Sequence, residues 1–130
     1  MKKYVAIILL LFCIQITVGQ SQAEKQKEIE FFKFEMQQLN DSSERCFDKG
    51  IKLLKEGESP KEIATLISPE LAKWEVEIEE KLIAFKIVAK KLKFTEEELA
   101  DIFRELKAIF KSTQEKYKYL KENGVQINSF

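Results

Sequence analysis

Two short clusters of carboxylates are the residues in this sequence whose type and spacing come nearest to catalytic or metal-binding chemistry. They are Glu75, Glu77, Glu79 and Glu80, and then Glu96, Glu97 and Glu98. Paired carboxylates can share acid-base work or hold a hard cation. On a helix, however, Glu77 lies four residues before Lys81, the spacing of an ordinary ion pair, and no Glu-x-x-His motif completes a di-metal site. We therefore interpret the first cluster as a solvated helix face, and we predict no metal site.

The other candidate for chemistry is Cys46, the one cysteine that follows residue 19. The sequence contains no histidine, which excludes Ser-His and Cys-His nucleophile pairs and removes the commonest general base. Without such a base the thiol lacks the usual route to a thiolate at neutral pH. We expect Cys46 to pack in the core. The alternative is a free thiol that is available to form a disulfide between chains or to take part in redox chemistry. The sequence predicts no catalytic residue and no cofactor, and therefore a protein that is not an enzyme.

The first 19 residues have the three-part layout of a secretory signal peptide. Lys2 and Lys3 precede the apolar run Val5–Ile14, and the polar tail Gln15–Gly19 follows. The apolar run is about half the roughly 20 residues that a membrane-spanning helix needs. We predict cleavage before Gln20 or a few residues downstream, which gives a signal peptide over 1–19 and one domain over 20–130. The product would be exported, to a periplasm or outside the cell, with no stable membrane anchor.

Charge narrows the choice of partner for the cleaved chain. Loss of two lysines with the leader leaves 20 basic and 22 acidic side chains, a net charge of −2. Such a chain lacks the basic footprint that nucleic acids and anionic membrane surfaces require. We therefore expect no nucleic acid and predict a protein partner or a homo-oligomer.

Helix starts are marked by hydroxyl caps followed by proline or acidic residues. Ser59-Pro60-Lys61-Glu62 combines an N-cap, a proline at the first helical position and a glutamate that can reach back to the cap. Ser68-Pro69 repeats the cap and proline, and Thr95–Glu98 forms a capping box. Asn123-Gly124 is a good helix stop. These signals predict helices near 22–56, 69–93 and 96–122, with a short helix near 60–67.

Hydrophobic periodicity supports the same assignment. In the last helix Leu99, Ile102 and Leu106 begin a stripe with three- and four-residue steps, and three aromatic residues widen it, namely Phe103, Phe110 and Tyr117. The first helix keeps a seven-residue register across Asn40–Ser43, where we allow for a kink. Trp74–Glu79 alternates as a strand would, but the absence of breaking residues around it favours helix. The predicted fold is therefore all-α: a small bundle of three long helices plus one short helix, with coiled-coil-like packing.

Phe31 and Phe34 lie off the apolar stripe of the first helix and share a second face. Either the helix is buried on both sides, or the pair forms an exposed aromatic patch. An exposed patch would be a possible interaction surface, typical of binding to a partner or to a second copy.

The run Phe94-Thr95-Glu96-Glu97-Glu98-Leu99 is followed by Phe110-Lys111-Ser112. On these residues the chain resembles the exported bacterial helical family named domain of unknown function 2059, over roughly residues 70–122. The resemblance implies a helix pair and no catalytic residues. The chain departs from the family at Thr113-Gln114, where the family has a proline. The same region looks, more faintly, like short helical envelope stress chaperones.

These observations together predict an exported, non-enzymatic helical protein that acts as a protein-interaction or self-associating module. The alternative is a periplasmic chaperone-like stress protein that binds apolar client surfaces. The two differ in whether the exposed apolar surface is discrete or broad.

Overall fold

The computed structural model of the chain describes the backbone of residues 2–127 and the side chains of residues 22–127. It contains three helices, α1 (Lys2–Lys55), α2 (Pro60–Lys91) and α3 (Glu96–Glu122), and no strand among these residues. The prediction of an all-α bundle is confirmed. Trp74–Glu79 lies inside α2, and α1 runs through Asn40–Ser43 without a break.

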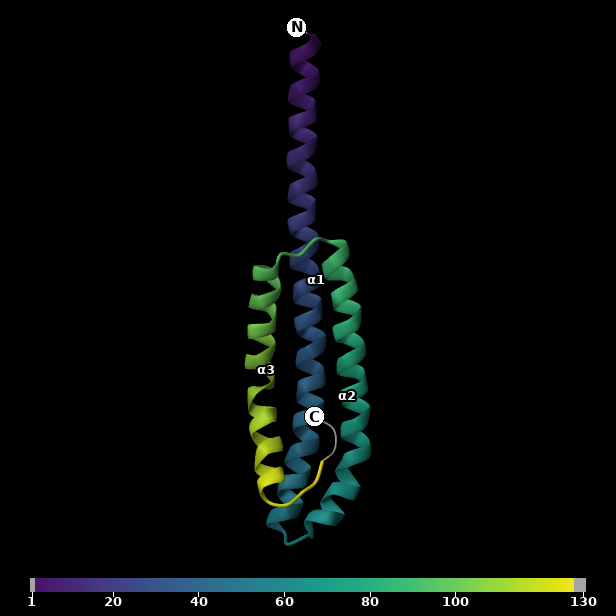
Figure 1. Ribbon diagram of the computed structural model, residues 1–130, viewed down its shortest axis with the longest axis vertical. Coiled ribbons are helices and arrows are strands. Elements are labelled where there is room, and N and C mark those ends of the chain that lie inside the picture. The colour runs from purple at the N-terminus through teal and green to yellow at the C-terminus, as the bar shows by residue number, and fades with distance from the viewer. Residues whose placement is uncertain (1, 128–130) are drawn as a thin grey trace.

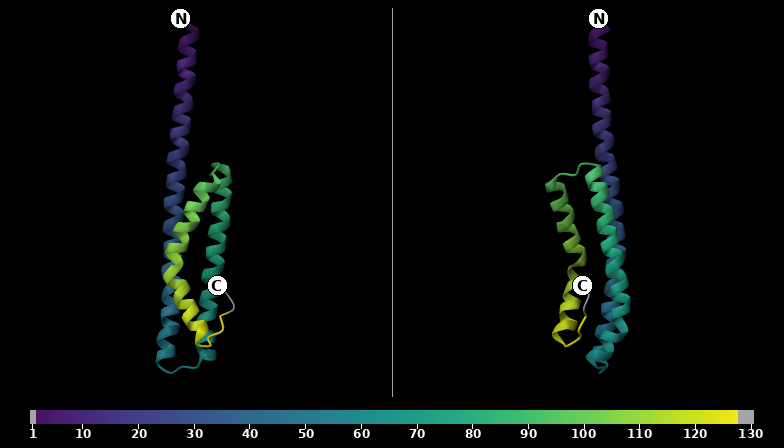
Figure 2. Two further views of the ribbon diagram at one scale, coloured as in Figure 1. Left: turned by 60° about the vertical axis from the view of Figure 1, so that its left-hand side comes forward. Right: turned by 45° about the vertical axis from the view of Figure 1, so that its right-hand side comes forward.

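In Figure 1, α1 runs down, α2 runs up and α3 runs down, with α1 between the other two. Both α2 and α3 pack along α1, but no Cα atom of α2 lies within 8 Å of a Cα atom of α3. Figure 2 shows the N-terminal part of α1 continuing beyond the bundle. The predicted signal peptide, residues 1–19, falls where side chains lie outside the described residues, so its cleavage stays a prediction.

The two helix starts marked by Ser59 and Thr95 are confirmed. The Ser59 side chain accepts a hydrogen bond from the backbone N–H of Glu62. Thr95 and Glu98 form a reciprocal capping box, in which each side chain bonds the other residue's backbone N–H at 3.1 Å. These bonds satisfy N–H groups that a helix start otherwise leaves unpaired.

The prediction of a separate short helix near 60–67 was wrong, because α2 continues through Pro69 to Lys91. An interior proline costs a helix about 3 kcal/mol or more. The side chains of Ile63, Ile67 and Leu71 on either side of it are fully buried. Burying each such side chain contributes roughly 1.5–3 kcal/mol, so packing against α1 outweighs the local break.

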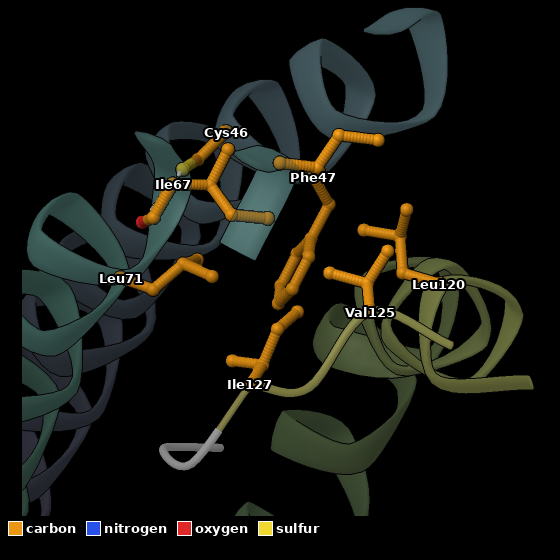
Figure 3. Packing of buried hydrophobic residues seen from close by; sticks show 8 residues of the cluster. Cys46, Phe47, Ile67, Leu71, Leu120, Val125 and Ile127 are labelled. Carbon is orange, nitrogen blue, oxygen red and sulfur yellow. Dashed lines mark hydrogen bonds between the residues drawn. The ribbon is translucent and has the colours of Figure 1, made fainter. Parts of the chain in front are cut away.

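Two apolar clusters form the core. The lower cluster lies at the bottom of Figure 1, and Gly50 beside it lets α1 approach α2 and α3 closely: a Cβ there would lie 3.1 Å from the Ile67 side chain and 3.3 Å from the Leu120 side chain. The lower cluster comprises Cys46, Phe47, Ile63, Ile67, Leu71, Leu120, Val125 and Ile127 (Figure 3). The upper cluster comprises Phe32, Met36, Leu39, Phe85, Ala89, Ile102 and Leu106.

A polar layer separates these clusters along the α1–α3 contact. The Thr113 hydroxyl donates to the side-chain oxygen of Asn40 at 2.6 Å, and both residues are buried. The Ser43 hydroxyl donates to the backbone carbonyl of Leu39, so the polar residues inside α1 are satisfied without a kink. This layer fixes the lengthwise register of α3 on α1, because a shifted helix would leave buried polar atoms unpaired.

After α3 the chain turns back over the lower cluster. Gly124 adopts a positive φ of 87°, and the N–H of Val125 bonds the carbonyl of Leu120, which together form a Schellman cap. Residues 123–127 then form a short strap, in which Val125 and Ile127 are buried beside Phe47 (Figure 3). The strap thus joins the end of α3 to the first half of α2 across the lower end of the bundle.

Candidate functional site

The structure places Cys46 inside the lower cluster, with 3% of its surface exposed. The thiol donates a weak hydrogen bond to the carbonyl of Ile67 at 3.7 Å. Burial, helped by the nearby charge of Glu70, raises the pKa of this thiol to about 12. A thiol so placed is protonated at neutral pH and sheltered from other chains, which argues against redox exchange.

Phe31 and Phe34 are each 59% exposed, so the structure matches the second of the two alternatives for this pair. With about 100° of turn per residue, Phe34 lies roughly 160° around α1 from the buried Met36. We call this side the outer face of α1, since α2 and α3 pack on the opposite side. The exposed neighbours Lys27 and Gln38 are polar, so the apolar patch is small.

The acidic residues predicted to be solvated include Glu75, Glu79 and Glu80, which are exposed. Lys81, the expected partner of Glu77 on the same helix, instead forms an ion pair with Glu35 of α1. Among the described residues, no group of three acidic or cysteine side chains could hold a metal ion.

A groove between α2 and α3 is large enough to receive a ligand. It arises because the two helices pack on α1 and stay apart from each other. Its volume is about 1020 Å³, and its surface is mostly apolar. We call it the α2–α3 groove; its apolar lining is Met36 of α1, Ile78 and Leu82 of α2, and Phe103, Leu106, Phe110 and Tyr117 of α3.

The α3 wall of the groove carries an aromatic ladder formed by Phe103, Phe110 and Tyr117, which recur every seven residues. Each lies three residues before a buried residue of the seam that packs toward α1, namely Leu106, Thr113 and Leu120. Three residues on a helix correspond to a rotation of about 60°, so the ladder is turned from α1 toward the groove.

Sequence reasoning missed this groove, because it assigned the ladder to the core as a widening of the stripe. The assignment to the core holds for Phe110 and Tyr117, which are partly buried and pack against the upper and lower clusters, and Tyr117 lies edge-on against Phe47. Phe103, in contrast, is 38% exposed. The signal that could have found it is the seven-residue repeat of aromatics beside a complete apolar seam. One helix carrying two adjacent seams is typical of a bundle position with two neighbours.

Charge around the α2–α3 groove is uneven. Four lysines of α3 line it, against the two carboxylates Glu75 and Glu115. The four are Lys107, Lys111, Lys118 and Lys121. In the described part of the chain, Lys107 and Lys111 make no ion pair. Lys118 forms a long ion pair with Glu122, in which the charged atoms lie 3.9 Å apart. The groove therefore has an apolar floor and a basic wall.

A different lysine, Lys116, faces α1 and holds the helices together. Its ammonium lies 2.7 Å from Asp48 and 2.9 Å from Glu44, and these carboxylates raise the pKa of Lys116. Lys116 and the Ser112 hydroxyl in turn lower the pKa of Glu44 by hydrogen bonding to its carboxylate. The charges of Lys116, Glu44 and Asp48 are therefore paired with each other across the α1–α3 contact, whereas Lys107 and Lys111 of the groove wall make no ion pair among the described residues.

Comparison with known proteins adds no relative: no family model, no curated protein and no solved structure matches the chain. The resemblance to domain of unknown function 2059 stays a prediction. Within the part of the chain that the structure describes, no helix combines the length and the apolar character needed to cross a membrane.

Proposed function

We propose that this chain is an exported, non-enzymatic protein-interaction module whose α2–α3 groove receives a helix of a partner protein. One observation carries the proposal. Two helices flank α1 without approaching each other, and the apolar strip between them is open. In a four-helix bundle each helix has two neighbours, so α2 and α3 hold the positions on either side of a missing fourth helix.

The strap of residues 123–127 supports this assignment, because it covers apolar side chains at the lower end of the bundle and leaves those along the upper groove partly exposed. At the lower end of the bundle, Val125 and Ile127 cover apolar side chains of α1, α2 and α3. Along the upper groove, Leu82 and Phe110 remain partly exposed. An amphipathic helix with apolar residues at three- and four-residue steps is the natural occupant of such a groove.

Export rests on the sequence of the leader, residues 1–19, with its basic start and short apolar run. Intact mass of the protein recovered outside the cytoplasm tests it. We expect a product that begins at Gln20 or a few residues later. A product that retains residues 1–19 in the membrane fraction would contradict export of a free domain.

Binding in the groove is tested with a fluorescent synthetic helix that has leucine at heptad positions, titrated in an anisotropy assay. Phe103→Glu places a charge on the groove wall, and we expect it to weaken binding at least tenfold. Phe34→Glu makes the same change on the outer face of α1 and is the matched control. Equal affinities for both variants, or no binding to the wild-type chain, would refute the proposal.

A chaperone-like role is the second candidate, and a specific observation favours it. Apolar side chains are also exposed on the outer faces of α1 and α2, where broad contact with unfolded clients could occur. These are Phe31, Phe34, Val76, Ile83 and Ile87. Suppression of client aggregation that is lost in outer-face variants and kept in Phe103→Glu would favour this role over the interaction module.

A further inference from the structure

We infer that the α2–α3 groove selects a partner helix whose edge against α3 carries acidic side chains. This inference rests on the proposed function and adds the chemistry of the partner. The expected acidic side chains face only the α3 wall of the groove, because the lysines that line the groove all belong to α3.

The positions of these lysines follow from the helix register. Lys107 and Lys121 each lie four residues after an aromatic of the ladder, Phe103 and Tyr117, and so stand about 40° farther around α3. In a helical bundle, positions that flank the apolar seam are those where charged residues of neighbouring helices meet. Lys111 is still farther out, at the rim. A helix lying on the ladder would therefore have its edge within reach of these ammonium groups.

The lysines of the groove wall are available for such contacts. Lys107 and Lys111 are exposed and make no ion pair among the described residues. The Lys121 ammonium lies 5.9 Å from the centre of the Tyr117 ring, which places its charge above the aromatic ladder. Lys116 on the same helix is already paired with α1 and Lys118 with Glu122, so the described lysines of α3 that make no ion pair are Lys107, Lys111 and Lys121, and all three line the groove.

Charge also argues against a second copy of the chain seated groove to groove. Where the two α3 walls face each other, four lysines of each copy would meet, with only Glu75 and Glu115 in each groove to offset them. Like charges at such positions are unfavourable. A partner with the opposite charge pattern is favoured instead.

The size of the effect follows from the exposure of these lysines. An exposed ion pair strengthens an interaction roughly 1.5- to 5-fold, so two to four pairs together give on the order of tenfold. These charges are in contact with solvent, so the preference is expected to weaken as ionic strength rises above about 0.1 M.

The test uses three synthetic amphipathic helices with the same leucine seam and with glutamate, glutamine or lysine along one flank. Binding to the full chain is measured by fluorescence anisotropy at low and high salt. We expect the glutamate helix to bind about tenfold more tightly than the glutamine helix, and the lysine helix to bind most weakly. The differences should shrink at high salt.

A charge-reversed variant, Lys107→Glu with Lys111→Glu, should invert the preference and favour the lysine helix. The matched control is Lys27→Glu with Lys52→Glu, which makes the same change of net charge at exposed positions on the outer side of α1. The control should keep the preference of the wild type, and circular dichroism should show that both variants remain helical.

The outcomes separate the two proposals. Equal binding of all three helices, with no response to charge reversal, would overturn this inference and leave the proposed function standing. Failure of every helix to bind would overturn the proposed function. Saturable binding of oleate that displaces the glutamate helix, and is lost after charge reversal, would assign the groove to an anionic lipid and overturn the inference.

Discussion

Leucine truncation at two points of α3 tests where the bundle is closed and where it is open. Leu106 belongs to the upper cluster and lines the groove, with 6% of its surface exposed. Leu120 belongs to the lower cluster, beneath the strap, and is fully buried. The two residues lie on the same seam of the same helix, so Leu106→Ala and Leu120→Ala differ in their surroundings and not in their chemistry.

The expected magnitudes follow from two contributions. Leu→Ala removes three methylene-sized groups, and the lost transfer free energy is about 2.4 kcal/mol at either site. A closed cavity adds a further cost, which brings enclosed sites to about 3–5 kcal/mol. The space left at Leu106 opens into the groove, where water can enter, so Leu106→Ala should cost about 2–3 kcal/mol. Leu120→Ala should cost at least about 1 kcal/mol more.

Urea unfolding measures both losses, with Trp74, the only tryptophan, as the fluorescent probe and circular dichroism as the second signal. Leu66→Ala, at an exposed position, is the control and should change the free energy of unfolding by less than about 0.5 kcal/mol. A loss that small at Leu106 would contradict its assignment to the core. Equal losses at Leu106 and Leu120 would contradict the difference between an open and a closed end.

Three further changes have expected outcomes. Lys93, between α2 and α3, has a positive φ of 57°, so Lys93→Gly should raise the free energy of unfolding by up to about 1 kcal/mol in urea unfolding; a loss of stability would contradict the strain. Because the hydrogen bonds of Glu44 lower its pKa from 4.5, its contribution to stability is complete above pH 4.5 and is lost as pH falls through the lowered pKa. Glu44→Gln should therefore flatten the acid side of the stability profile, and an unchanged slope would show that the ion pair with Lys116 does not act as described. Phe31→Glu with Phe34→Glu should leave the melting midpoint near that of the wild type, because both rings are exposed; a large fall in the midpoint would contradict that exposure, and loss of partner capture in the folded double variant would place binding on the outer face of α1 and not in the groove.

The elements that local chemistry determines were predictable from the sequence. Ser59 and Thr95 mark helix starts because their hydroxyls bond backbone N–H groups a few residues away, which needs no other part of the chain. The prediction that Pro69 starts a new helix was wrong. Packing of α2 against α1, which is distant in the sequence, decides whether the helix continues through this proline. Local signals therefore identified possible boundaries, and tertiary packing chose among them.

The candidate site was harder to predict for the same reason. Periodicity shows which side chains of α3 share a face, but it does not show which neighbour covers that face. Phe103 and Phe110 have the spacing of core residues, and only the distance between α2 and α3 reveals that they line a groove. Likewise, the spacing of Phe31 and Phe34 left both burial and exposure open, and the position of α2 and α3 on the other side of α1 decides it.

Photo-crosslinking from the groove tests most directly whether the groove is the binding site. A benzophenone attached at Gln114→Cys would lie in the lining of the groove, and one at Gln38→Cys would lie on the exposed side of α1. The native Cys46 should not react with the label in the folded protein, since it is buried and its pKa is raised to about 12. We expect the label at position 114 to capture the glutamate-flanked helix and the label at position 38 to leave it free. Capture from position 38 and not from position 114 would contradict the assignment of the groove as the binding site.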